Sequence, residues 1–496
     1  MRKIALAALV LLFVVAVTTT LVVRSWLAND RIKSTLEVQA SAAVGEPVHI
    51  GTLDVRWFPR PGLTLDNVTV GTVRSLSIDR MLLSTGLRPL LSGHIAEADI
   101  AVERSQLDAP RFFAVLTAPA SKTEPQTHAV LPLTIDAIRS ITLRDVALTS
   151  GRRTVLVNAD LAYATDGLTI RRFDARSNIT QLTASGAITD LTRRAGHLII
   201  DAASLDLDGL IEFMAPFGSG SAEPASKPNP FDISAQISAK AGRAIGAAFN
   251  DLAAASRVTN GRVTLDGLRF LLFGGRFNGG VAARTDGPEP QYDFRGSITG
   301  VDVARLVDFA GAPGTISGTL QARGSLRGAG SSVRDAFTTS SGSSQVVVRN
   351  GRVPRLEIVR TVILAFGRPA TERPLGSGEE FRELAADLAV GGGRATTHNL
   401  TFASRDFDMR GEGWIDLRTQ TLDLNVDVIL SRELSSQAGR DLYRYAAEGE
   451  RIMLPGRISG TVAHPSITLD TAQALERALK NTIKSRAKSL LDRIIR

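Results

Sequence analysis

Apolar and polar residues alternate along most of the chain, as they do in a β-strand with one buried face. The clearest example is the stretch "QTLDLNVDVIL" at 420–430. Asp423 and Asn425 stand on its polar face, and the opposite face carries Leu422, Leu424, Val426 and Val428. Similar but weaker alternation in other stretches of the chain predicts a protein built mainly of β-strands.

A short phrase interrupts this alternation five times, at 64–70, 142–148, 169–175, 264–270 and 396–402. In the first copy Leu65 and Val68 stand three residues apart, so the apolar positions slip by one. Such a slip turns side chains to the wrong face unless a bulge or bend absorbs a residue. The residue before the second apolar pair accepts positive φ in four copies, namely Asn67, Asp145, Gly267 and Asn399. Arg172 takes this place in the remaining copy.

We therefore predict a long antiparallel sheet of repeated, bent hairpins that forms a groove, with a few short helices. The expected apolar lining comprises Leu65, Val68, Val70, Leu143, Val146, Leu265, Leu268, Phe270, Leu422, Leu424, Val426 and Val428. Helical spacing appears at 302–311, 355–367 and 433–450, and again after residue 470. These helices are too few to cover every strand, so part of the apolar face needs another layer or a ligand.

The first residues predict a membrane anchor. Residues 4–23 carry no charge and are long enough to span a bilayer core of roughly 30 Å as a helix. Its apolar positions include Ile4, Leu9, Leu12, Phe13, Val17, Leu21 and Val23. A cleaved signal peptide is the competing interpretation, but no A-x-A cleavage site follows, which favours an uncleaved anchor. Long downstream domains translocate largely regardless of flanking charge, so we expect the bulk outside the cytoplasm.

Two segments rich in Pro, Ser, Ala and Gly have no apolar period and are interpreted as linkers. The predicted organisation is an anchor at 1–28, a first β subdomain at 29–116, a linker at 117–130, a second β segment at 131–217, a linker at 218–230, a third β region at 231–470 and a helix at 471–496.

The last segment, 471–496, is amphipathic and basic. Its apolar residues recur every three or four positions, and between them lie Lys480, Lys484, Arg486, Lys488 and Arg493. A basic amphipathic helix is typical of binding to a membrane surface. A helix that caps the last sheet and leaves its basic face in water explains the pattern equally well.

Composition argues against several kinds of chemistry. Of the formal net charge of +8, the last 26 residues hold seven basic and two acidic residues, which leaves the rest nearly balanced. With aromatics at only 5%, this excludes an extended nucleic-acid surface. There is no Cys, and the six His show no metal-ligand spacing. We expect neither an enzyme nor a metal or cofactor site.

The residues also resemble a known family. "STLEVQASAAVGEPVHIGTLDVRWFPRPGLTLDNVTV" resembles the opening of AsmA-like envelope proteins of Gram-negative bacteria. "GRVTLDGLRFLLFGGRFNGGVAA", "GVDVARLVDF", "TISGTLQARGSL" and "LPGRISGTVAHPSITLD" are similar to the AsmA C-terminal region, in the same order. Residues 29–116 are thus AsmA N-terminal-like, and residues 231–470 are AsmA C-terminal-like.

The resemblance implies an inner-membrane anchor with the bulk of the chain in the periplasm. It also implies a relation to bridge-like lipid transfer proteins and a role in outer-membrane lipid homeostasis and envelope biogenesis. The implied partners are a phospholipid or another envelope lipid, the inner membrane, and proteins of the outer membrane or envelope. A non-enzymatic structural or assembly scaffold for outer-membrane proteins remains the alternative.

Overall fold

The computed structural model divides the chain into two compact units, Met1–Gly246 (unit 1) and Ala247–Arg496 (unit 2). It describes residues 33–34, 37–38, 40–41, 46–56, 60–71, 76–86, 94–95, 97–111, 134–135, 138–164, 167–190, 193–218, 231–331, 335, 338–365, 378–437, 447–448 and 451–470. The predicted anchor at 4–23, the C-terminal helix at 471–496 and nearly all of both linkers lie outside these ranges. Within the described residues, no helix combines the length and apolarity needed to cross a membrane.

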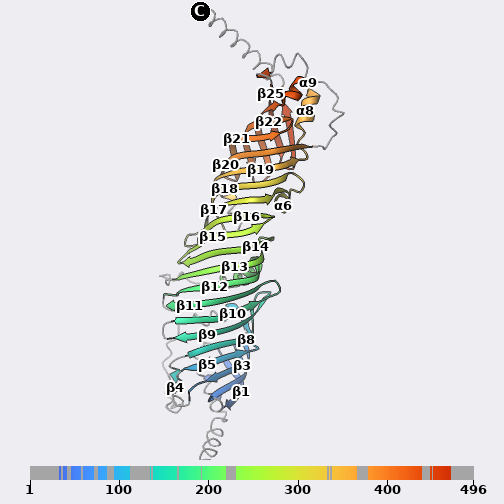
Figure 1. Ribbon diagram of the computed structural model, residues 1–496. Coiled ribbons are helices and arrows are strands. Elements are labelled where there is room, and N and C mark those ends of the chain that lie inside the picture. The colour runs from blue at the N-terminus through green and yellow to red at the C-terminus, as the bar shows by residue number, and fades with distance from the viewer. Residues whose placement is uncertain are drawn as a thin grey trace, which may run out of the picture. The chain divides into compact units, whose positions relative to one another are not determined.

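The described part of unit 1 is built almost entirely of strands (Figure 1). They are β1 (Val48–Arg56), β2 (Gly62–Val70), β3 (Leu76–Ser84), β4 (His94–Ile95), β5 (Ala98–Glu103), β6 (Gln106–Asp108), β7 (Thr134–Ile135), β8 (Ile138–Ser150), β9 (Arg153–Ala164), β10 (Gly167–Arg176), β11 (Gln181–Asp190), β12 (Ala195–Asp206) and β13 (Asp232–Ala244). The helix α5 (Leu207–Met214) and the 3-10 turn η1 (Ala215–Gly218) follow β12.

The sheet of unit 1 is mixed, so the prediction of an antiparallel sheet throughout was wrong. Most neighbours are antiparallel, but β8 runs parallel to β5 and β6, and β13 runs parallel to β12. The reason lies in the connections. A tight hairpin makes an antiparallel pair, whereas a parallel neighbour needs a longer crossover. After β12 the chain forms α5 and then returns, so that Asp232 begins β13 beside Ala195.

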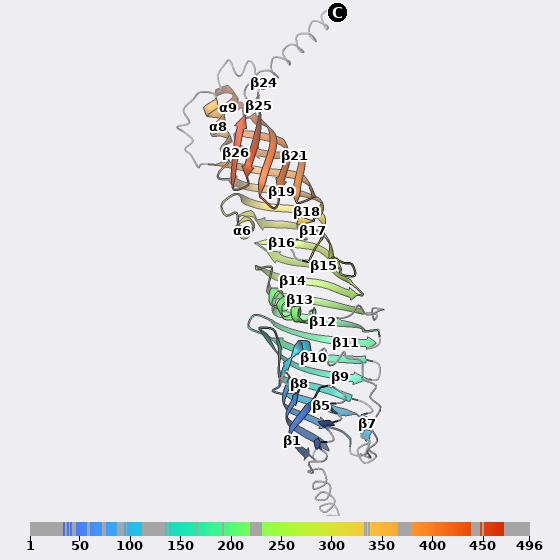
Figure 2. The ribbon, with the colours of Figure 1, turned by 180° about the vertical axis from the view of Figure 1, so that it is seen from behind.

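The described part of unit 2 repeats the strand pattern and adds the short helices α6, α8 and α9 (Figures 1 and 2). Its elements are β14 (Ala247–Thr259), β15 (Arg262–Leu272), β16 (Gly275–Arg284), β17 (Gln291–Asp302), α6 (Val303–Phe309), β18 (Ser317–Ala329), β19 (Ser341–Val353), α8 (Ile358–Ala365), β20 (Glu379–Gly391), β21 (Arg394–Ser404), β22 (Phe407–Asp416), β23 (Thr421–Leu430), α9 (Arg432–Gln437), β24 (Ala447–Glu448), β25 (Arg451–Thr461) and β26 (His464–Leu469). From β14 to β23 each strand pairs antiparallel with the next, and β25 pairs with both β23 and β26.

The prediction of a mainly β fold with few short helices is confirmed. α6 and α8 lie inside the stretches predicted to be helical. The helix predicted at 433–450 was wrong at Ala447 and Glu448, which pair with β25 as the strand β24. Strand pairing there overrides a local pattern that is weak as a guide to helix. α5 was not predicted.

Candidate functional site

One face of unit 2 is apolar in register across neighbouring strands. The register of β16, β17 and β18 sets three parallel rows on this face. From one side to the other, the rows are Phe277, Ile298 and Ala322; Gly279, Gly296 and Gly324; and Val281, Phe294 and Leu326. The middle set, called the glycine row below, has no side chains. It forms the floor of a shallow channel between two apolar walls.

The two edges of this face differ. The edge at which β17, β19 and β23 end carries the helices α6, α8 and α9, and we call it the helix rim. Figure 2 shows these helices along one side of unit 2. At the opposite edge short turns join β14 to β15, β20 to β21, and β22 to β23, and we call it the turn rim.

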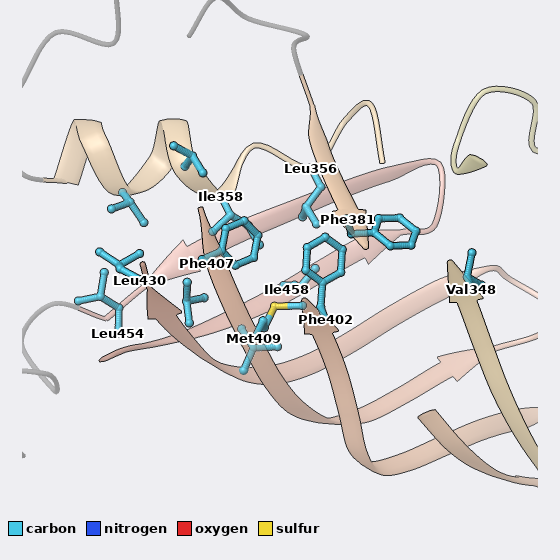
Figure 3. Packing of buried hydrophobic residues seen from close by; sticks show 14 of the residues in the cluster. Val348, Leu356, Ile358, Phe381, Phe402, Phe407, Met409, Leu430, Leu454 and Ile458 are labelled. Carbon is cyan, nitrogen blue, oxygen red and sulfur yellow. The ribbon is translucent and has the colours of Figure 1, made fainter. Parts of the chain in front are cut away.

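The helices fold over the apolar face. Ile358, Val359 and Val362 of α8 are almost fully buried against strand residues such as Phe407 and Leu430 (Figure 3). α6 contributes Val303, Leu306 and Val307 to the same core, and α9 contributes Leu434. Near the helix rim the apolar face is therefore a closed hydrophobic core.

Burial falls from the helix rim towards the turn rim. On β17, Val301 is 4% exposed whereas Phe294 is 36% exposed. On β23, Val426 and Val428 are buried, while Leu422 and Leu424 are only half-buried. The apolar face is thus covered on one side and left partly open on the other.

A cavity of about 170 Å³ lies in the open part. Its lining includes Phe277, Phe294, Ile298, Ala322, Gly324 and Leu326. It therefore follows the glycine row across β17 and β18. The walls are almost entirely apolar and offer no cluster of charges for a polar ligand.

Unit 1 has an apolar face of the same kind. Leu65, Val68, Val70, Leu143 and Val146, which were predicted to line the groove, gather in one hydrophobic cluster of this unit. Leu65 and Leu143 are half-buried, whereas the three valines are buried. Further along the sheet, Leu198, Ile200 and Ile237 remain half-buried, while Ala202 and Ala239 are buried.

In unit 2, the predicted lining residues divide between the two environments. Leu268 is buried, and Leu265 and Phe270 are half-buried on the apolar face of β15. Val426 and Val428 lie inside the closed core. Leu422 and Leu424 pack against that core from its open side.

The repeated phrases contain the irregularities of the strands. Asn67, Asp145 and Gly267 have φ values of 56°, 52° and 59°. Asn399 differs from these three residues, because it is not left-handed. There the strand absorbs residues in a bulge between Thr397 and Leu400, where the Asn399 side chain bonds to Asp387. In the copy at 169–175, a bulge next to Arg172 absorbs the extra residue.

Two features of these bends were not predicted from the sequence. Gly51 lies opposite Asn67, and β1 and β2 keep their register through the bend, so both strands change face together. A Cβ at Gly51 would lie 2.8 Å from the Asn67 Cβ, which requires glycine. Arg104, between β5 and β6, is also left-handed, with φ of 51°. These two bends could have been found from the sequence if shifts in the apolar alternation had been compared between adjacent strands.

The polar face of unit 2 carries ion pairs between neighbouring strands. Arg457 Nε donates to Asp423 at 2.6 Å, and Arg327 pairs with Asp293 at 2.8 Å. The hydrogen bond from Arg457 lowers the pKa of Asp423. Such pairs stabilise the solvated side of a sheet. The apolar face is the opposite side of the same strands. Among the described residues, no group of three His, Asp or Glu could hold a metal ion.

Comparison with known proteins finds one family. The model of the AsmA family matches residues 221–400. This match supports assignment of the protein to the AsmA family. The matched region contains the three rows, α6 and most of α8 to β21. No curated protein and no solved structure matches the chain. The match to the AsmA family and an extended β-sheet with an apolar groove fit a general role in lipid transport or the cell envelope.

Proposed function

We propose that this AsmA-family protein binds the acyl chains of envelope lipids along the apolar faces of its sheets and transfers them. In this proposal it contributes to outer-membrane lipid homeostasis and envelope biogenesis without catalysing a reaction. The observation that carries the proposal is the fall in burial across unit 2. Phe294 and Leu326 form an apolar wall that no described helix covers.

The shape of the open channel suits an acyl chain. Half-buried apolar residues leave area in contact with water, which costs roughly 25 cal/mol per Å² relative to burial. A lipid tail removes that area from water without hydrogen-bonding partners. The headgroup would stay at the turn rim, outside the channel, where water can solvate it.

We further propose that residues 4–23 anchor the chain in the inner membrane, with the bulk in the periplasm. The basic C-terminal segment would contact a membrane surface. Full-length protein should then resist alkaline extraction, and its body should be cut by protease from the periplasmic side. A soluble form that begins near residue 26 would identify residues 4–23 as a signal peptide instead.

A structural or assembly scaffold for outer-membrane proteins is the alternative function. The closed core around α8 favours it, because there the apolar face is satisfied without ligand. The two functions make different demands on the open part of the face. A scaffold needs no lipid there, whereas a transfer protein must hold lipid after gentle extraction.

A carboxylate placed on either side of one strand tests the proposal. Leu326→Asp puts a charge into the open channel, where it can remain hydrated, so we expect a folded protein with much less bound lipid. Ser325→Asp is the matched control on the opposite face and should retain lipid. Val426→Asp buries the charge in the closed core and should cost more than about 4 kcal/mol. Lipid per protein and melting temperature are the measurements. Equal lipid in Leu326→Asp and Ser325→Asp would refute the groove.

A further inference from the structure

The position of one aromatic ring in unit 2 suggests a barrier inside the channel. Phe277 lies on β16 in the row beside the glycine row, and it is only 4% exposed. Its ring does not stay within its own row. A Cβ built on Gly279 or on Gly296 would lie 2.8 Å from the Phe277 Cζ. The tip of the ring therefore rests on both glycines and crosses the floor of the channel.

Other aromatic rings pack against the ring of Phe277. Phe270 stacks on it with ring centres 4.6 Å apart and planes inclined by 23°. The ring of Phe294, on the next strand, also packs against Phe277, with ring centres 5.4 Å apart. Phe249 packs against Phe270 with ring centres 6.5 Å apart. Four rings from β14 to β17 thus form one aromatic group, in which stacking stabilises the position of Phe277.

The cavity begins at this ring. Its lining runs from Phe277 over Gly296 and Gly324 to Ser344 on β19. Gly279, the first member of the glycine row, is not part of it. The open channel over β17 to β19 therefore has Phe277 as its end wall.

We infer that Phe277 is a barrier residue that ends the acyl-chain path at β16, and that movement of its ring controls passage along unit 2. This inference rests on the proposed function. A tail that lies on Gly324 and Gly296 meets the ring before it reaches Gly279. It can continue only when the ring turns off the two glycines. Phe277 thereby sets both the length of chain held over β17 to β19 and the rate at which lipid passes β16.

Two substitutions of opposite size test this barrier. Phe277→Leu keeps an apolar side chain but lacks the ring tip, and Phe277→Trp extends it. The full-length protein transfers fluorescent phosphatidylglycerol between vesicles of phosphatidylethanolamine and phosphatidylglycerol, and the rate is measured. We expect Phe277→Leu to accelerate transfer and Phe277→Trp to slow it, each by about fourfold. This is the change in rate that corresponds to the burial free energy of one methylene group.

Phe402→Leu is the matched control. Phe402 is 3% exposed and stacks on Phe407, but it lies in the closed core. This control should lower the melting temperature without raising the transfer rate. The barrier is wrong if Leu and Trp at 277 shift the rate in the same direction, or if Phe402→Leu accelerates transfer as much as Phe277→Leu. If every variant binds lipid and all transfer it at the same rate, the barrier hypothesis is refuted but the proposed lipid groove is not. Absence of lipid from the wild type would overturn both.

Discussion

The backbone N–H of Val359 donates a hydrogen bond of 2.8 Å to Glu379 Oε1, in a site where both residues are almost fully buried. Val359 lies in the first turn of α8, and Glu379 begins β20. The free N–H groups at the start of a helix need acceptors, and a carboxylate there also meets the positive end of the helix dipole. This contact fastens the helix cover to the sheet beneath it.

Loss of this carboxylate should loosen the cover. Glu379→Ala leaves a buried N–H without its acceptor, which should lower the free energy of unfolding by about 1–3 kcal/mol. Glu380→Ala changes the exposed neighbour on the same strand and should stay within about 0.5 kcal/mol of the wild type. Denaturant unfolding measures both. Equal stability of the two variants would show that Glu379 does not hold α8.

The bends can be tested where only backbone conformation matters. Gly267 has a φ of 59°, and no atom lies within 4 Å of the place where a Cβ would stand. Gly267→Ala should therefore cost about 1 kcal/mol through the left-handed backbone alone. Gly391 is equally open but is not left-handed, so Gly391→Ala is the control and should be nearly neutral. Thermal unfolding of both variants checks the difference, and equal losses would contradict it.

The outer edge of β1 is protected by side chains. The N–H of Ile50 donates to Glu37 Oε1 at 2.7 Å, and the N–H of Val48 donates to Ser41 Oγ at 2.8 Å. An unprotected edge strand invites pairing with another sheet. The double variant Glu37→Ala/Ser41→Ala should therefore self-associate in analytical ultracentrifugation. Val38→Ala, a change at an exposed residue nearby, should leave the association state unchanged. A monodisperse double variant would speak against this role.

The turn after β22 predicts a pH dependence. Asp416 accepts hydrogen bonds from the N–H groups of Thr419 and Arg418, which lower its pKa from 3.8 to about 2. Because the folded pKa is the lower one, this contribution to stability is complete above pH 3.8 and is lost as the pH falls through about 2. Asp416→Asn should reduce the melting temperature at pH 6 and approach the wild type near pH 2. A constant difference across this range would contradict the prediction.

Much of the architecture could be predicted from the sequence because strand geometry is local. Side chains alternate with a period of two, so the order of residues in "TLDLNVDVIL" already assigns Leu424 and Asp423 to opposite faces. Left-handed φ is equally local, which is why Asn67 and Gly267 could be named as bends. Asn399 shows the limit, since a bulge held by its side chain replaces the left-handed residue.

Only the tertiary structure decided which parts of the apolar face are covered. Val426 and Leu422 are both apolar and lie on the same face of β23, yet Val426 is buried and Leu422 is half-buried. The reason is that α8 packs over one end of the strand only. Parallel pairing at β13 likewise depends on where a returning chain docks. The contact of Phe277 with Gly279 and Gly296 requires the register between β16 and β17, and register is a relation between strands. Period and bend are properties of a single strand, whereas cover and register arise when strands and helices pack together.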